Sequence, residues 1–237
     1  MGTVRYDLHL HTEFSPDCDT PLDAIEAHCL RRGLTGIAVT DHDSIEGALR
    51  LRDRARKLDV LVGEEVTARE GDVIGLFLEE RIPPRLSAAE TMEAIHAQGG
   101  LVYLPHPFDK RRARRTGGGS LLAILDQVDI VEAFNGKVGQ DRYNALAEEF
   151  ARRHGKLCGG GSDAHALNAI GTVYTEFDLP EGEPLTPAAL LACLAEAQIV
   201  GKRRSPVGAW LVRGRRPLSL AWRRLLKARS ERERRRP

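Results

Sequence analysis

Residues 4–17 read Val-Arg-Tyr-Asp-Leu-His-Leu-His-Thr-Glu-Phe-Ser-Pro-Asp, and this stretch decides which fold the chain adopts. It begins with a mainly apolar run that predicts a β-strand over residues 4–9. His9 and His11 are two positions apart, so both imidazoles point to the same side at the end of that strand, while Leu10 faces the helical layer. The stretch therefore predicts a strand whose carboxyl end directs two imidazoles at one point.

The first 200 residues alternate short runs rich in Val, Ile and Leu with segments of helical character, which predicts parallel βα units. An α/β domain can use the whole length of such a chain. The predicted strands are 4–9, 34–40, 60–65, 73–78, 101–104, 130–133 and 156–159. The predicted helices are 21–32, 44–57, 87–98, 120–127, 141–154 and 186–198.

Charge is distributed unevenly, although the whole chain carries a net charge of only +1. Residues 201–237 hold 14 Lys or Arg against 2 Glu, a net of +12, so the first 200 residues carry −11. An acidic body suits cation binding, whereas a basic tail favours nucleic acid or an anionic membrane, or only solubilises the chain. We predict one domain over residues 1–206 and a partly helical tail over 207–237 whose end is disordered.

Composition excludes several classes of protein. The chain is 42% hydrophobic and 29% charged, which is typical of a globular protein and not of a disordered or membrane-embedded one. No apolar run approaches the roughly 18 residues of a membrane span, and the first residues lack the pattern of a secretion signal. The four cysteines form no CxxC pair. We therefore expect a cytoplasmic protein without a transmembrane segment.

Other potential ligands follow other predicted strands. Because the carboxyl ends of parallel strands meet at one edge of a barrel, side chains at these ends are expected to lie together. Five of the eight histidines occupy such positions, each near a carboxylate. The candidates beyond the first strand are Asp41, His42, Glu65, His106, Asp163 and His165, the last two after a predicted turn of three glycines.

Four blocks of sequence resemble the PHP domain family, which is found in polymerase-associated modules and in one class of histidinol phosphatase. The blocks are Asp7-Leu8-His9-Leu10-His11-Thr12-Glu13-Phe14-Ser15-Pro16-Asp17, Thr40-Asp41-His42, Gly63-Glu64-Glu65 with Pro105-His106-Pro107, and Gly161-Ser162-Asp163-Ala164-His165. The resemblance covers residues 4–206 and includes a short PHP-associated segment from about residue 160. It implies a distorted (β/α)7-like barrel with a metal cluster at the carboxyl ends of its strands.

The resemblance also implies which residues bind metal. One ion would be held by His9, His11, Glu65 and Asp163, with Glu65 bridging to a second ion at His106. A third would use Asp17, His42 and His165. Phosphatase members of the family supply a further His after the fourth strand, where this chain reads Gly75-Leu76-Phe77. We therefore expect two or three divalent ions of zinc, manganese or iron, with the second ion weakly held or absent.

Clustered cations favour hydrolysis of a phosphoester, because a bound ion lowers the pKa of its water from about 15.7 toward roughly 7 and neighbouring ions stabilise phosphoryl charge. Asp41 is predicted to orient an imidazole, and it and His106 are the predicted catalytic residues. Glu64 is expected to point away from Glu65. The predicted phosphate-binding residues are Lys110, Arg111, Arg112 and Asn135. The arginine run could equally be a solvated loop, and Asn135 could equally cap a turn.

The favoured function is hydrolysis of a phosphomonoester, either a nucleotide or a small metabolite. One alternative is an exonuclease acting on short RNA or DNA, suggested by the basic tail. Another is a non-catalytic regulatory module that binds metal. No obligate protein partner is expected from the sequence.

Overall fold

The computed structural model describes residues 2–109 and 118–201, which belong to one compact unit, Met1–Lys202. Lys110, Arg111, Arg112 and the tail over 207–237 lie outside the described residues. The strands are β1 (Gly2–Leu10), β2 (Gly36–Val39), β3 (Asp59–Thr67), β4 (Asp72–Leu76), β5 (Leu101–Leu104), β6 (Ile130–Asn135), β7 (Leu157–Gly161), β8 (Val173–Leu179) and β9 (Gln198–Gly201). The α-helices are α1 (Leu22–Arg31), α2 (Glu46–Arg54), α3 (Ala88–Ala97), α4 (Gly118–Ile124), α5 (Asp141–Arg153) and α6 (Pro187–Leu194).

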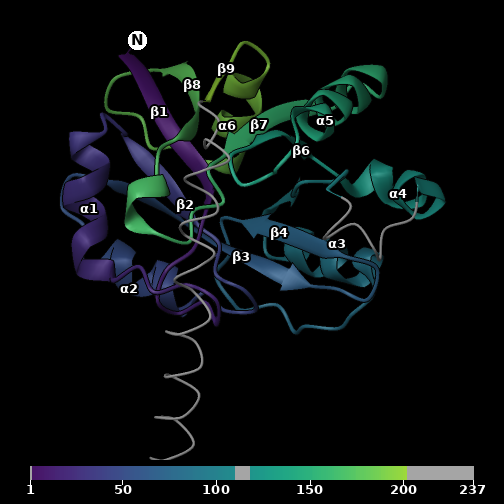
Figure 1. The fold of residues 1–237 in the computed structure, drawn as a ribbon, viewed down its shortest axis with the longest axis horizontal. Coiled ribbons are helices and arrows are strands. Elements are labelled where there is room, and N and C mark those ends of the chain that lie inside the picture. Colours follow the sequence, from purple (N-terminus) through teal and green to yellow (C-terminus); the bar gives the residue numbers. More distant parts are fainter. Residues whose placement is uncertain (1, 110–117, 202–237) are drawn as a thin grey trace, which may run out of the picture. The chain divides into compact units, whose positions relative to one another are not determined.

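The nine strands form one sheet in the order β7-β6-β5-β4-β3-β2-β1-β8-β9 (Figure 1). The pairs β1–β2, β2–β3, β5–β6 and β6–β7 are parallel, as the βα pattern predicts. The seven predicted strands and the α/β barrel class are confirmed. Among the described helices, none is long and apolar enough to cross a bilayer.

Strand β4 departs from the expected parallel order, because it runs antiparallel to both β3 and β5. A short connection from Thr67 to Asp72 joins β3 to β4 directly, with no helix between them. As a result, Gly75 pairs with Glu64 and Leu76 with Gly63, and β4 leads away from Glu65 as it continues. The absence of a ligand at Gly75-Leu76-Phe77 stays a prediction. Ile74, which pairs with Glu65, is the β4 residue beside the ligands.

Strands β8 and β9 are absent from the sequence-based prediction. β8 pairs antiparallel with β1, and β9 pairs antiparallel with β8. The burial of Val173, Thr175, Phe177 and Leu179 alternates with partly or fully exposed positions, which is the signature of a strand with one covered face. The helix predicted over residues 186–198 is shorter in the structure than predicted, because α6 ends at Leu194 and β9 follows it.

The sheet closes where β1 meets the end of β7. The amide of Asp163 donates to the carbonyl of His9 at 2.7 Å, and the amide of His11 donates to the carbonyl of Ala164 at 2.9 Å. At Gly161 a Cβ atom would lie 2.3 Å from the Cβ of His9, so only glycine permits this approach. The predicted three-glycine turn is therefore wrong: these glycines are the last residues of β7, packed against β1.

Apolar side chains form two clusters, one inside the barrel and one between the sheet and the helices. Leu8 belongs to the inner cluster and Leu10 to the outer one, although residues two apart normally share a face. The register of β1 against β2 shifts between Asp7 and Leu10, and such a bulge re-aims the side chains beyond it. The bulge therefore sets the direction of the two histidines.

Candidate metal centre

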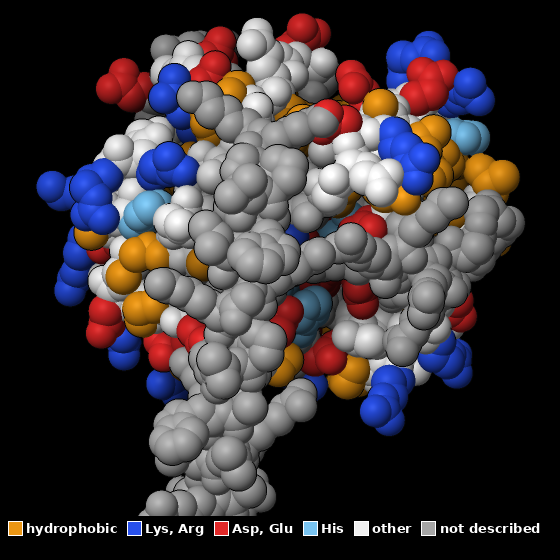
Figure 2. Space-filling view, viewed as in Figure 1, with side chains coloured by type: hydrophobic (Ala, Val, Ile, Leu, Met, Phe, Trp, Pro, Cys, Tyr) orange, Lys and Arg blue, Asp and Glu red, His pale blue; other side chains and the backbone are white. Residues whose placement is uncertain are grey.

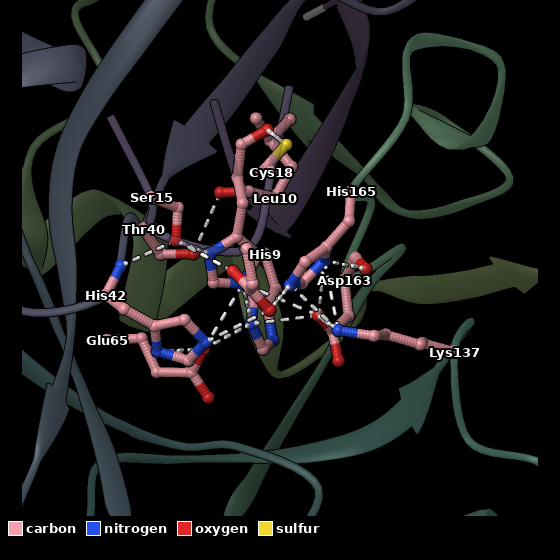
Figure 3. A network of polar contacts seen from close by, with 12 residues as sticks. His9, Leu10, Ser15, Cys18, Thr40, His42, Glu65, Lys137, Asp163 and His165 are labelled. Atoms are coloured by element: carbon pink, nitrogen blue, oxygen red, sulfur yellow. Dashed lines mark hydrogen bonds and ion pairs between the residues drawn. The ribbon is translucent and has the colours of Figure 1, made fainter. Parts of the chain in front are cut away.

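All eight residues predicted to bind metal come together at one end of the barrel. Figure 3 labels five of them, His9, His42, Glu65, Asp163 and His165. They come from β1, β3 and the segments that follow β1, β2, β5 and β7. Histidine and acidic side chains also come to the surface together in the middle of the face shown in Figure 2. Their ligand atoms form three overlapping groups, which are His9–Glu65–His106, His9–His11–Asp163 and His11–Asp17–His42–His165.

The rings of His9 and His11 form the centre of the cluster. Their Nε2 atoms lie 3.2 Å apart, and both side chains are fully buried. Nδ1 of His9 is 2.9 Å from a carboxylate oxygen of Glu132, and Nδ1 of His11 is 3.2 Å from the hydroxyl of Ser15. A proton on each Nδ1 satisfies these contacts, which leaves the lone pair of each Nε2 directed into the site.

Glu65 connects the three groups. Its Oε1 lies 3.0 Å from Nε2 of His106, while its Oε2 lies 3.2 Å from Nε2 of His11 and 3.4 Å from Nδ1 of His42. Burial opposes ionisation of this carboxyl, but the surrounding imidazoles outweigh it and hold the pKa of Glu65 well below its usual range. Glu65 is therefore an ionised carboxylate whose two oxygens face different imidazoles of the cluster.

The group formed by Asp17, His42 and His165 with His11 lies nearer the solvent. Oδ2 of Asp17 is 2.8 Å from Nε2 of His165 and 3.9 Å from Nε2 of His42. The side chains of Asp17 and His42 are 37% and 21% exposed, whereas His9 and His11 are fully buried. Burial and nearby positive charge lower the pKa of His165 to about 3, so its imidazole is neutral at pH 7. A substrate can reach the centre from this side.

Two ligands have a backbone that disfavours most residues. His106 has a φ of 31° and Asp163 a φ of 48°, both in the left-handed region. Such conformations persist only where the surrounding structure enforces them, and they concentrate at functional sites. The amide of His106 donates to Glu132 at 2.7 Å, and the amide of Asp163 donates to His9. These bonds fix the strained residues toward the cluster.

Glu132, on β6, is a site residue that the sequence analysis did not find. Its carboxylate contacts Nδ1 of His9, the amide of His106 and the side-chain amide of Asn135. Burial would lower the pKa of His9, but Glu132, Asp163 and Glu65 outweigh it and raise that pKa well above its usual value. A charged residue within the apolar run of β6 was the available signal, because a buried charge requires partners.

Asn135 does not have the predicted role of binding a substrate phosphate. Its side chain is buried, and its Nδ2 donates to Glu132 at 2.9 Å and to Asp163 at 3.2 Å. Its Oδ1 accepts the amides of Lys137 and Val138 at 2.9 and 3.1 Å. All its polar atoms are thus used to position a ligand and to form the turn after β6, in agreement with the turn-capping alternative.

Asp41 also lies beside the cluster. In the described part of the chain its carboxylate makes no hydrogen bond with the ring of His42. Its two oxygens accept the amide and the hydroxyl of Thr12 at 2.6 and 2.7 Å. Its carboxylate thus fixes the loop after β1, and its role in orienting an imidazole stays a prediction. Glu64 points away from Glu65, as expected, and accepts the amide of Ile82.

The donor set fits divalent cations. Imidazole nitrogens and carboxylate oxygens within 4.8 Å of one another are the usual ligands of zinc, manganese and iron. The facing Nε2 atoms of His9 and His11 support the same conclusion, because two lone pairs at that distance are satisfied by a cation between them. Cys18 does not join this set, since its thiol donates to the carbonyl of His11.

Comparison with known proteins agrees with the resemblance drawn from the sequence. The family model of the PHP domain matches residues 7–152, and that of the PHP-associated segment matches residues 141–199. An uncharacterised protein of Methanocaldococcus jannaschii is 31% identical over 198 residues, which cover 81% of this chain and 79% of that protein. A phosphoribosyl 1,2-cyclic phosphate 1,2-diphosphodiesterase of Eggerthella lenta is 31% identical over 128 residues. This match covers 48% of this chain and only 48% of that enzyme.

The fold also matches a solved structure. PsfC from Pseudomonas syringae superposes with a TM-score of 0.71 at 17% identity, covering 92% of this chain and 99% of that one. The match confirms the barrel fold, and the family agrees with the prediction of a hydrolase that acts on phosphoester bonds. The family model covers more than half of the sequence, so the chain belongs to the PHP family.

Proposed function

We propose that the protein is a metal-dependent phosphomonoesterase. The observation that carries this proposal is the position of Glu65, whose two oxygens reach His106 on one side and His11 and His42 on the other. A carboxylate shared in this way is suited to a site with adjacent ions, and adjacent ions stabilise both the attacking and the leaving oxygen of a phosphoester.

The residues that would hold the ions are His9, His11, Asp17, His42, Glu65, His106, Asp163 and His165. When bound, the ions supply a water molecule of lowered pKa and positive charge against the phosphoryl oxygens. We expect zinc, manganese or iron, because the ligands combine imidazole with carboxylate and include no thiolate.

The chain's own residues orient these ligands and restrict water. Glu132 and Ser15 hold the Nδ1 sides of the two central imidazoles, so that both rings keep one orientation. Asn135 holds one oxygen of Asp163 and leaves Oδ1 facing the cluster. The buried inner ligands exclude bulk water, and the partly exposed Asp17 and His42 lie on the side from which a phosphate group enters.

The test combines elemental analysis of the purified protein with a screen of phosphate esters at matched metal loading. We expect two or three ions per chain and hydrolysis of monoesters, with nucleotides and small phosphorylated metabolites included in the panel. His11→Ala should abolish turnover, whereas His154→Gln, an exposed histidine of the same chain, should leave it unchanged.

Other outcomes of the screen separate the alternatives. Preferential cleavage of short oligonucleotides over mononucleotides would indicate the exonuclease. Full metal occupancy without turnover of any ester would indicate the regulatory module. The named relative from Eggerthella lenta is a diesterase, so cyclic phosphodiesters belong in the panel as well.

A further inference from the structure

Lys137 brings a positive charge to the ligands, from a turn that the sequence analysis did not single out. Its Nζ lies 3.2 Å from Oδ1 of Asp163 and 2.8 and 3.0 Å from the two ring nitrogens of His165. Figure 3 shows the side chain extending from the far side of Asp163 toward His165. A cation is therefore built into the edge of the metal centre.

The backbone under this side chain is fixed. The amides of Lys137 and Val138 both donate to Oδ1 of the buried Asn135, which also contacts Asp163. Asn144, on α5, accepts the amide of Asn135 and donates to its carbonyl. The stem of Lys137 thus starts from a defined point beside the ligands, and its flexible four-carbon chain lets the ammonium group change position.

The ammonium group of Lys137 is about equally close to both ring nitrogens of His165 and also contacts Oδ1 of Asp163, so it lies against two of the residues that would hold metal. A metal ion held by these residues would lie close to the ammonium group, and like charges at such a distance repel strongly. When His165 ligates metal, the ammonium must move aside, and its side chain is already 23% exposed.

The group that satisfies an ammonium beside bound cations is an anion that contacts both. We propose that Lys137 binds a non-bridging oxygen of the substrate's phosphate group, and that this contact makes the site select phosphomonoesters over phosphodiesters. The inference rests on the proposed function and deepens it. A monoester is a dianion near neutral pH and offers one more charged oxygen than a diester, so an added cation favours it.

The first test is binding of inorganic phosphate to the metal-loaded protein, measured by calorimetry. Lys137→Met should weaken phosphate binding roughly 10- to 100-fold, the effect of losing one charge-assisted hydrogen bond. Lys137→Arg should retain part of the affinity. Lys57→Met is the matched control, since it removes the same charge from an exposed position away from the cluster and should change nothing.

The second test separates this role from a structural one. Metal content by elemental analysis should be the same in Lys137→Met as in the parent protein. In turnover, KM for a monoester should rise at least tenfold, while KM for a diester changes much less. Unchanged phosphate affinity in Lys137→Met, or a loss of phosphate affinity that only follows a loss of metal, would overturn the inference.

Failure of the proposed function gives a different result from failure of this inference. If no ester is hydrolysed but phosphate binding still depends on Lys137, the phosphate subsite stands and the enzymatic proposal falls. If monoesters are hydrolysed and Lys137→Met matches the parent in both phosphate affinity and KM, the enzymatic proposal stands and the subsite falls.

Discussion

The carboxylate of Glu132 lies 2.9 Å from Nδ1 of His9, and both side chains are fully buried. The same carboxylate accepts the amide of His106 and the side-chain amide of Asn135 through its second oxygen. Glu132 therefore receives hydrogen bonds from three directions and donates none. This arrangement fixes the proton of His9 on Nδ1 and keeps Nε2 available for metal.

Replacing Glu132 with Gln should lower metal affinity by about 10- to 100-fold. A glutamine has one oxygen and one NH₂ group, so one of the three donors must face another donor. The backbone amide of His106 is always a donor. His9, in contrast, can move its proton from Nδ1 to Nε2 and then accept a hydrogen bond on Nδ1. That tautomer cannot bind metal through Nε2, and elemental analysis after dialysis should show the loss.

The control for this variant is Glu149→Gln, which removes an acidic residue from an exposed ion pair with Arg152 and Arg153. It should retain the metal content of the parent protein. Equal metal content in Glu132→Gln and Glu149→Gln would show that the carboxylate does not control the His9 tautomer.

The sequence was sufficient to predict that the eight candidate ligands lie together, because they lie at or after the carboxyl ends of strands and because their motifs have a recognisable order. It was not sufficient for the residues that hold those ligands. Glu132 and Lys137 act through contacts with residues distant in sequence, such as His9 and His165. The direction of β4 was also missed, because periodicity identifies a strand but does not say whether its neighbours are parallel.

Ile74→His should strengthen metal binding at His9, Glu65 and His106. Ile74 is buried and pairs directly with Glu65 across antiparallel strands, so the two side chains share a face about 5 Å apart. An imidazole at position 74 would add a fourth potential ligand to this group of three residues. The checking measurement is metal retention against a competing chelator, with Ile74→Asn as the control that adds polarity without an imidazole. Equal retention by the two variants would contradict the prediction.

Asn135→Asp should destabilise the protein strongly. The new carboxylate would lie about 3 Å from the carboxylates of Glu132 and Asp163, where the asparagine donates hydrogen bonds. A buried, uncompensated charge costs several kcal/mol, so we expect about 3 kcal/mol or more, with partial recovery when metal is added. Thermal unfolding measures this loss. The same change at the exposed Asn168 should alter stability by less than about 0.5 kcal/mol, and similar losses at both positions would be inconsistent with the proposed network.

Glu64 should make the folded state less stable as pH rises from 4.5 to 7. Burial raises the pKa of Glu64 from 4.5 to about 7, although the amide of Ile82 and the positive charge of Arg81 act in the opposite direction. Below pH 4.5 the group is protonated in both states and has no effect. Between pH 4.5 and 7 the unfolded chain releases the proton while the folded chain retains it, so unfolding becomes easier, and above pH 7 the loss is complete.

Glu64→Gln should therefore raise the free energy of unfolding more at pH 8 than at pH 4. The difference should be up to about 3 kcal/mol, which corresponds to the shift in the pKa of Glu64. Glutamine can still accept the amide of Ile82, which is 2.8 Å from Oε2 of Glu64. Denaturant unfolding of both proteins across this pH range measures the difference. A stability gain that stays constant with pH would mean that Glu64 ionises normally in the folded protein, and that Arg81, whose Nε lies 3.7 Å from Oε1, compensates for burial.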